Sequence, residues 1–248
     1  MRKNWRRAKI RVALCYPRSY RVAHSGYTVA HLYGLLNSLD GVLCERVFYD
    51  PVSPPRSVES GRPLAAFDVA AFTLQYEEDY PLVLRMLEAA GINPLREERG
   101  PEDPIVVGGG PCATANPYPL LPFFDAFFVG ELDPYAEEFA QALVDSREQG
   151  SLEPLTDLPP LLVPGLKEEA ERSCVARLDD APHVVAQPVL ESDDPALSPI
   201  FGRCFYVEVT RGCGVGCRFC LHGWTWRPYR ERSLDEVEAI IEEGLERT

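Results

Sequence analysis

The sequence predicts an α/β protein whose first part, residues 9–148, is a doubly wound parallel sheet. Short apolar runs alternate there with stretches of helical periodicity, and this pattern is typical of βα units. Glycines and prolines separate the runs, as expected for the turns between strands and helices. Apolar residues make up 46% of the chain and charged residues 25%, which is the composition of a globular protein with a hydrophobic core.

Five apolar runs are expected to form strands, at residues 10–16, 42–49, 69–74, 105–107 and 126–129. A proline-rich stretch at 51–63 must be a loop. Five strands with intervening helices predict a flavodoxin-like sheet with helices on both faces.

Three helices are expected, two between these strands and one after the fifth strand. The first has Ser25 as its N-cap and stops at Gly41, and the second runs from near Asp79 to Gly91. The third spans residues 134–147. Apolar side chains recur on one face of the first helix, so that face is expected to cover the sheet.

Residues 149–203 form a proline-rich connector without a persistent period, expected to pack on the surface as a few extended pieces. A third region, 204–248, begins with a strand at 205–209, continues as a loop over 210–232, and ends in a helix that starts at Ser233. Ser233 and Glu236 have the spacing of a capping box. Leu234, Val237, Ile241 and Leu245 form an apolar stripe on this helix.

The charge balance argues against general nucleic-acid binding. The net charge is −13, and such a surface repels polyphosphate. No run reaches the ~18 apolar residues of a membrane-spanning helix. The basic N-terminus precedes an apolar run that is short, ends at Pro17 and has no small-residue cleavage site. We therefore expect a cytoplasmic protein that does not associate with membranes.

The eight cysteines are unevenly placed. Cys15 and Cys44 lie in apolar runs, where buried free thiols are common. Four others fall within 17 residues: Cys204, Cys213, Cys217 and Cys220. In a chain without an export signal, this cluster indicates metal binding more than disulfides.

The spacing Cys213-x3-Cys217-x2-Cys220 suits a [4Fe–4S] cluster, because a short glycine-containing loop can wrap three thiolates around one face of the cube. Three cysteines leave one iron of the cluster without a protein ligand, and an open coordination position is typical of a catalytic metal centre. The alternative is a structural zinc site with Cys204 or His222 as fourth ligand, in a module that binds a corrinoid or a partner. Zinc usually takes paired Cys-x2-Cys knuckles, and only one pair is present.

This loop, with Phe219 before the last cysteine, resembles the signature of the radical S-adenosylmethionine (SAM) superfamily. The segment from Leu221 to Ser233 resembles the sequence after the cluster loop in uncharacterised Fe–S oxidoreductases with an N-terminal cobalamin-binding-like domain. Several upstream stretches are similar to the same group: residues 16–20, 25–27, 76–80, 108–111 and 116–117.

The resemblance implies an enzyme of the radical SAM class. Cys213, Cys217 and Cys220 would hold the cluster, with Phe219 packed beside it, and SAM would bind the open iron. One electron, from a small reductant protein such as a flavodoxin or ferredoxin, would split SAM into methionine and a 5′-deoxyadenosyl radical, which takes a hydrogen atom from the substrate. The protein's part is to hold and shield this chemistry.

Gly108, Gly109 and Gly110 follow the fourth expected strand, at the edge where doubly wound domains bind ligands. By resemblance this loop would face the nucleotide tail of cobalamin. The Asp-x-His-x-x-Gly motif that supplies the lower cobalt ligand in many cobalamin domains is absent. The sequence thus favours a domain that has lost cobalamin and shapes the substrate pocket, although a corrinoid bound without a histidine ligand stays open.

The aromatic residues after the cysteines allow two interpretations. Trp224, Trp226 and Tyr229, interleaved with arginines, could stack on RNA bases. They could instead cover the cluster and brace the following helix, which the acidic overall charge favours. The substrate itself, and whether it is methylated, thiolated or rearranged, is not encoded in these residues.

By resemblance the catalytic domain is a partial TIM-type barrel of six βα units. At about 30 residues a unit this needs roughly 180 residues, whereas 45 follow from Cys204 onward. The chain is therefore expected to hold only the first βα unit of the barrel and to be inactive alone.

Overall fold

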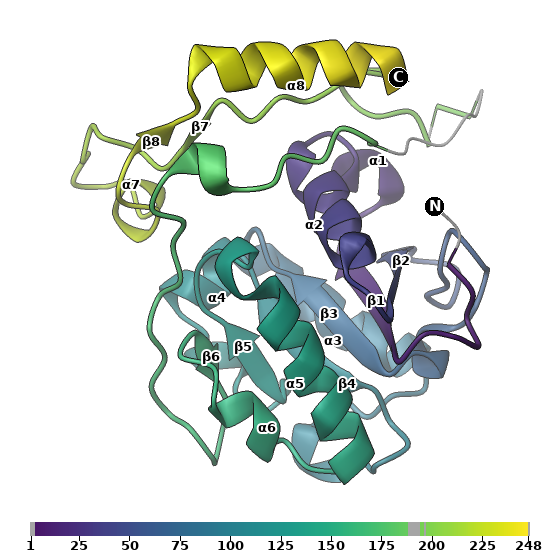
Figure 1. Ribbon diagram of the computed structural model, residues 1–248. Helices are drawn as coiled ribbons and strands as arrows, with labels where there is room; N and C mark the ends of the chain where they lie inside the picture. The colour runs from purple at the N-terminus through teal and green to yellow at the C-terminus, as the bar shows by residue number, and fades with distance from the viewer. Residues whose placement is uncertain (1–2, 188–193, 196, 248) are drawn as a thin grey trace.

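The computed structural model describes residues 3–187, 194–195 and 197–247. A six-stranded sheet with the order β2-β1-β3-β4-β5-β6 forms its centre (Figure 1). The first five strands are parallel and β6 is antiparallel to β5. The strands are β1 (Ile10–Tyr16), β2 (Val42–Phe48), β3 (Val69–Thr73), β4 (Ile105–Gly109), β5 (Ala126–Phe128) and β6 (Leu161–Leu162).

Helices cover both faces of this sheet, which defines a doubly wound α/β fold. On one face α2 and α5 pack on side chains such as Val12 and Val107, and on the other α3 packs on Ala70 and Phe72. The helices are α1 (Tyr20–Ala23), α2 (Tyr27–Ser38), α3 (Tyr80–Ala89), α4 (Pro111–Ala115), α5 (Ala136–Gln149), α6 (Glu153–Thr156), α7 (His222–Thr225) and α8 (Leu234–Arg247).

The five strands expected in the doubly wound domain all form, each within two residues of its expected ends. The first helix begins differently, because its N-cap is Gly26 and not Ser25. The Ser25 hydroxyl donates a hydrogen bond to the Arg21 carbonyl at 2.6 Å and accepts one from the Ile200 amide at 2.8 Å. Ser25 thus ties α1 to a distant part of the chain, and this use of its hydroxyl competes with capping.

The connector contributes to the sheet, which the sequence pattern did not indicate. Leu161 and Leu162 of β6 pair with Phe128 and Phe127 of β5. Both leucines are buried. The buried edge strand β5 thus gains a partner for its backbone groups, as buried polar groups require.

The strand expected at residues 205–209 does not form. Its backbone amides bond to side chains of the connector: Tyr206 donates to Gln187 Oε1 at 2.9 Å, and Glu208 donates to His183 Nε2 at 3.1 Å. A ladder appears only afterwards, where β7 (Thr210–Arg211) pairs antiparallel with β8 (Arg230–Glu231). Side-chain acceptors have replaced the neighbouring strand that a longer ladder would need.

Helix α8 lies across the carboxyl end of the sheet (Figure 1). The Glu236 amide donates to Ser233 Oγ at 3.3 Å, so the serine half of the expected capping box forms. The Ser233 amide donates to the Asp179 carboxylate at 2.8 Å instead of to Glu236. Leu234 and Leu245 of the apolar stripe are exposed, whereas Ile240 is buried. No helix in the described part of the chain is long and apolar enough to cross a membrane.

Candidate functional site

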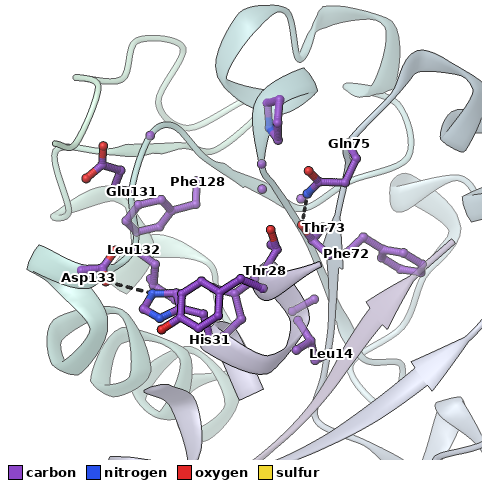
Figure 2. A pocket seen from close by; sticks show the side chains of 18 of the residues that line it. Leu14, Thr28, His31, Phe72, Thr73, Gln75, Phe128, Glu131, Leu132 and Asp133 are labelled. Carbon is purple, nitrogen blue, oxygen red and sulfur yellow. Dashed lines mark hydrogen bonds and ion pairs between the residues drawn. The ribbon is translucent and has the colours of Figure 1, made fainter. Parts of the chain in front are cut away.

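A cavity of about 470 Å³ lies at the carboxyl edge of the sheet, within the size range of small-molecule sites. Its floor comes from β1, β3 and β4, and its side from α2 and the segment after β5 (Figure 2). The wall is completed by six residues near the C-terminal end of the chain: Glu208, Thr210, Arg211, Gly212, His222 and Trp226. The cavity is therefore enclosed jointly by the doubly wound domain and by the segment that carries the cysteines. This is the crevice in which doubly wound domains hold ligands.

Gly108 and Gly109, at the end of β4, and Gly110, directly after it, line this cavity, and the packing around them explains two of the three glycines. A Cβ at Gly108 would meet the Phe127 ring at 2.9 Å, so the aromatic core leaves no space for a side chain. Gly110 has a φ of +96° and its Cβ would lie 2.9 Å from the Leu74 carbonyl oxygen, a conformation that favours glycine. At Gly109 only ordinary contacts surround a Cβ. The fold itself thus requires Gly108 and Gly110.

Polar side chains in the wall are already paired with one another. Gln75 Nε2 donates to Thr73 Oγ1 at 2.7 Å, and His31 Nε2 lies 2.9 Å from Asp133 Oδ1 (Figure 2). Burial raises the pKa of Asp133, but contacts from His31 and Arg211 outweigh it and hold that pKa well below its usual range. Asp133 therefore stays ionised at neutral pH.

The cysteine loop, residues 212–229, runs from β7 to β8 and contains Cys213, Cys217 and Cys220. All three thiols are half-buried and none is in a disulfide. The Cys220 amide donates to the Cys217 carbonyl at 3.1 Å, and Cys220 Sγ accepts from the Gly223 amide at 3.4 Å. Three accessible thiols on one short loop are the donor set of an iron–sulfur cluster. They fit that group in chemistry and number.

The loop does not gather these ligands into a formed site. In the part of the chain that is described, no three His, Cys, Asp or Glu side chains stand close enough together to hold a metal ion. Cys204 Sγ contacts the backbone carbonyls of Phe201 and Gly202. His222 is exposed at the cavity wall. Phe219 is 92% exposed and so is packed against little in this chain.

The two ends of the cysteine loop are fixed by a buried charge network. Arg211 of β7 and Arg230 of β8 both bond to Glu131, which follows β5. Arg211 also pairs with Asp133 at 2.9 Å and with Glu208 at 2.8 Å. Burial raises the pKa of Glu131, but hydrogen bonds from Arg230 and the Val175 amide, together with Arg211, hold it below its usual value.

The arginines after the cysteines serve internal contacts. Arg230 and Arg232 are buried, and Arg232 Nη1 donates to the carbonyls of Leu178 and Ala181 at 2.8 and 3.0 Å. The Arg227 guanidinium lies over the Trp224 ring, 4.0 Å from its centroid. The buried guanidinium groups of Arg230 and Arg232 are not available to phosphates, whereas the side chains of Trp224 and Tyr229 are exposed.

Glu131, Asp133 and His31 are not among the site residues expected from the sequence. A signal was present, because Gly130-Glu131-Leu132-Asp133 directly follows a buried strand, and residues there reach the ligand edge of a parallel sheet. The bonding partners of these side chains lie about 80 to 100 residues away along the chain, beyond the reach of any local pattern.

The structure is thus a doubly wound α/β protein with a cavity at the carboxyl edge of its sheet, and Gly212, His222 and Trp226 of the cysteine loop line part of that cavity. The model of the family described as radical SAM proteins, N-terminal, matches residues 28–164. The chain belongs to this family.

A relative is the uncharacterized protein MJ0966 of Methanocaldococcus jannaschii, which is 31% identical over 182 residues. The match covers 72% of this chain and 35% of the relative, so the chain spans about a third of that protein's length. No solved structure matches the chain.

Proposed function

We propose that the chain is the N-terminal part of a radical SAM enzyme in which Cys213, Cys217 and Cys220 are the ligands of a [4Fe–4S] cluster. The observation that carries this proposal is the placement of three accessible thiols on one loop beside the cavity, in a chain of the radical SAM N-terminal family. When bound, such a cluster supplies the electron that splits SAM, bound at its open iron, into methionine and a 5′-deoxyadenosyl radical.

The residues of this chain would hold and shield that chemistry. The charge network fixes both ends of the cysteine loop. Trp224 Nε1 donates to the Cys217 carbonyl at 3.0 Å, which orders the middle of the loop. Phe219 would become covered by further protein or by bound SAM.

For the doubly wound domain, flavodoxin-like in its strand order, we propose that the cavity receives the substrate and not a corrinoid. Its wall includes Arg211 and Trp226 from the cysteine-bearing segment, so a molecule bound there would lie next to that loop. Anaerobic incubation with hydroxocobalamin followed by gel filtration tests this. A stoichiometric corrinoid spectrum on the protein would overturn the assignment. An external one-electron donor such as a flavodoxin or ferredoxin, and a cytoplasmic location, belong to the same proposal.

The test of the cluster is anaerobic iron–sulfide reconstitution, dithionite reduction, and EPR with and without SAM. We expect a [4Fe–4S]⁺ signal that changes when SAM is added. Cys213→Ser, Cys217→Ser and Cys220→Ser should each abolish it, whereas the matched control Cys204→Ser should retain it. Tightly bound zinc in place of iron and sulfide would instead support a binding module with a structural metal site.

A further inference from the structure

Two arginines face each other across the short ladder that closes the cysteine loop. In the β7–β8 register Arg211 lies opposite Arg230, and all three cysteines of the proposed cluster lie between these strands. Like charges directly opposite one another on paired strands are destabilising. A ladder of two residue pairs is also short by any measure. We call this β7–β8 ladder the stem of the cysteine loop. The closed loop therefore depends on a group that neutralises the two positive charges of the stem.

Glu131 supplies the neutralising charge from the doubly wound domain. Its Oε2 accepts from Arg211 Nη1 at 2.9 Å and from Arg230 Nη1 at 3.0 Å, and its Oε1 accepts from Arg230 Nη2 at 2.7 Å. The Glu131 side chain is only 2% exposed and that of Arg230 only 5%. Removing one partner of a buried ion pair leaves an uncompensated charge and is strongly destabilising.

The position of the Glu131 carboxylate is set independently of the cysteine loop. The Glu131 amide donates to the Ser173 carbonyl at 3.1 Å, and Oε2 accepts from the Val175 amide at 3.0 Å. The preceding residue, Gly130, has a φ of +99°, and a Cβ there would lie 2.2 Å from the Ser173 carbonyl oxygen. Glu131 is thus held by the end of β5 and by the connector, and offers a fixed anion to the stem.

The two arginines do not depend on Glu131 to the same extent. Arg211 also pairs with Asp133 and Glu208. Within the described ranges Arg230 is ion-paired with Glu131 alone, and its remaining bonds go to uncharged groups such as the Val175 carbonyl at 2.7 Å. Loss of the Glu131 charge would therefore release the β8 side of the stem first.

We propose that Glu131 is a positioning residue for the cysteine loop: it closes the Arg211–Arg230 stem from the neighbouring domain and so holds together the two ends of the loop that carries Cys213, Cys217 and Cys220. This inference rests on the proposed function for its consequence in cluster binding, but the closing of the stem can be measured without metal. It assigns the doubly wound domain a part in assembling the metal centre, in addition to lining the cavity.

The first experiment compares Glu131→Gln with the matched control Glu137→Gln, an exposed position on α5, by hydrogen exchange of the metal-free chain. Charge-assisted hydrogen bonds are each worth about tenfold or more in an equilibrium constant. We therefore expect exchange about tenfold faster in peptides covering residues 210–211 and 230–232 of Glu131→Gln, with β1 to β4 unchanged. Equal exchange in the stem of Glu131→Gln and wild type would overturn the proposal.

The second experiment removes the repulsion instead of restoring the anion. In Glu131→Gln/Arg230→Gln no like charges face each other across the stem, so at least half of the lost protection should return. A double variant as open as Glu131→Gln would contradict the charge argument. Arg230→Gln alone perturbs the stem from the loop side and is the test to use if Glu131→Gln does not fold.

Iron and sulfide content after reconstitution of the same proteins links the stem to the cluster. We expect Glu131→Gln to load less than half the iron of wild type, and the double variant to recover. If wild type binds no iron, the proposed function fails while the exchange data still decide the role of Glu131. If Glu131→Gln has an open stem but loads iron normally, the positioning role is wrong and the cluster assignment stands.

Discussion

His24 is predicted to make the stability of the doubly wound domain depend on pH. Its imidazole is 4% exposed, and its Nε2 lies 2.9 Å from Arg46 Nη1, so the neutral ring accepts a hydrogen bond from the guanidinium. Burial, and then the Arg46 charge, lower the pKa of His24 from 6.5 to about 3. The folded protein therefore holds His24 neutral where the unfolded chain protonates it.

The direction and the size of this pH effect on stability follow from the difference between the pKa values of His24 in the folded and unfolded states. Because the folded pKa is depressed, the stabilisation is complete above pH 6.5 and is lost as the pH falls from there toward 3. At pH 5, protonation of His24 favours the unfolded chain by a factor of about 10^1.5 in the unfolding equilibrium constant, whereas the folded state is almost unprotonated. This factor corresponds to about 2 kcal/mol of lost stability. For a chain of this size that is a shift in Tm of roughly 4–8 °C.

The assay is urea unfolding followed by circular dichroism at pH 7.5, 6.5, 5.5 and 5.0, for wild type, His24→Gln and the control His222→Gln. Glutamine keeps an acceptor for Arg46 but does not titrate. Between pH 7.5 and pH 5, the unfolding free energy of wild type should fall by about 2 kcal/mol more than that of His24→Gln. The exposed His222 should give no such shift. A wild-type to His24→Gln difference that is constant across this range would refute the reasoning.

Two further substitutions test the packing around the site. Gly130→Ala should lower the unfolding free energy by several kcal/mol, because its Cβ would lie 2.2 Å from the Ser173 carbonyl oxygen. The control Gly61→Ala, at φ +70° with nothing within 4 Å of its Cβ, should lower it by only about 1–2 kcal/mol, for the backbone conformation alone. Equal losses in thermal unfolding would show that Ser173 gives way. Asp125→Asn should cost about 3 kcal/mol, because it leaves the Arg99 guanidinium, paired at 2.9 Å and 4% exposed, without its counter-charge. A loss below 1 kcal/mol in urea unfolding would mean that water reaches Arg99.

Much of the doubly wound domain could be predicted from the sequence, because its information is local. A buried parallel strand is a short continuous apolar run, and residues 10–16 and their four counterparts are read directly from such runs. Gly91, with φ +74°, follows the last turn of α3 as predicted from its position. The burial of Cys15 and Cys44 follows from the same runs. The spacing of the three cysteines likewise belongs to the sequence alone.

The tertiary structure decided which residues from distant parts of the sequence contact one another. The sixth strand, Leu161–Leu162, is too short to carry a period and exists because the edge of β5 accepts it. The strand expected at 205–209 does not form, because the amides of Tyr206 and Glu208 donate to the side chains of Gln187 and His183 and not to a neighbouring strand. Glu131 reaches Arg211 and Arg230 across 80 and 99 residues. Electrostatic pairing depends on distance in space and not along the chain, so the fold alone brings together the carboxylate, the stem and the cavity.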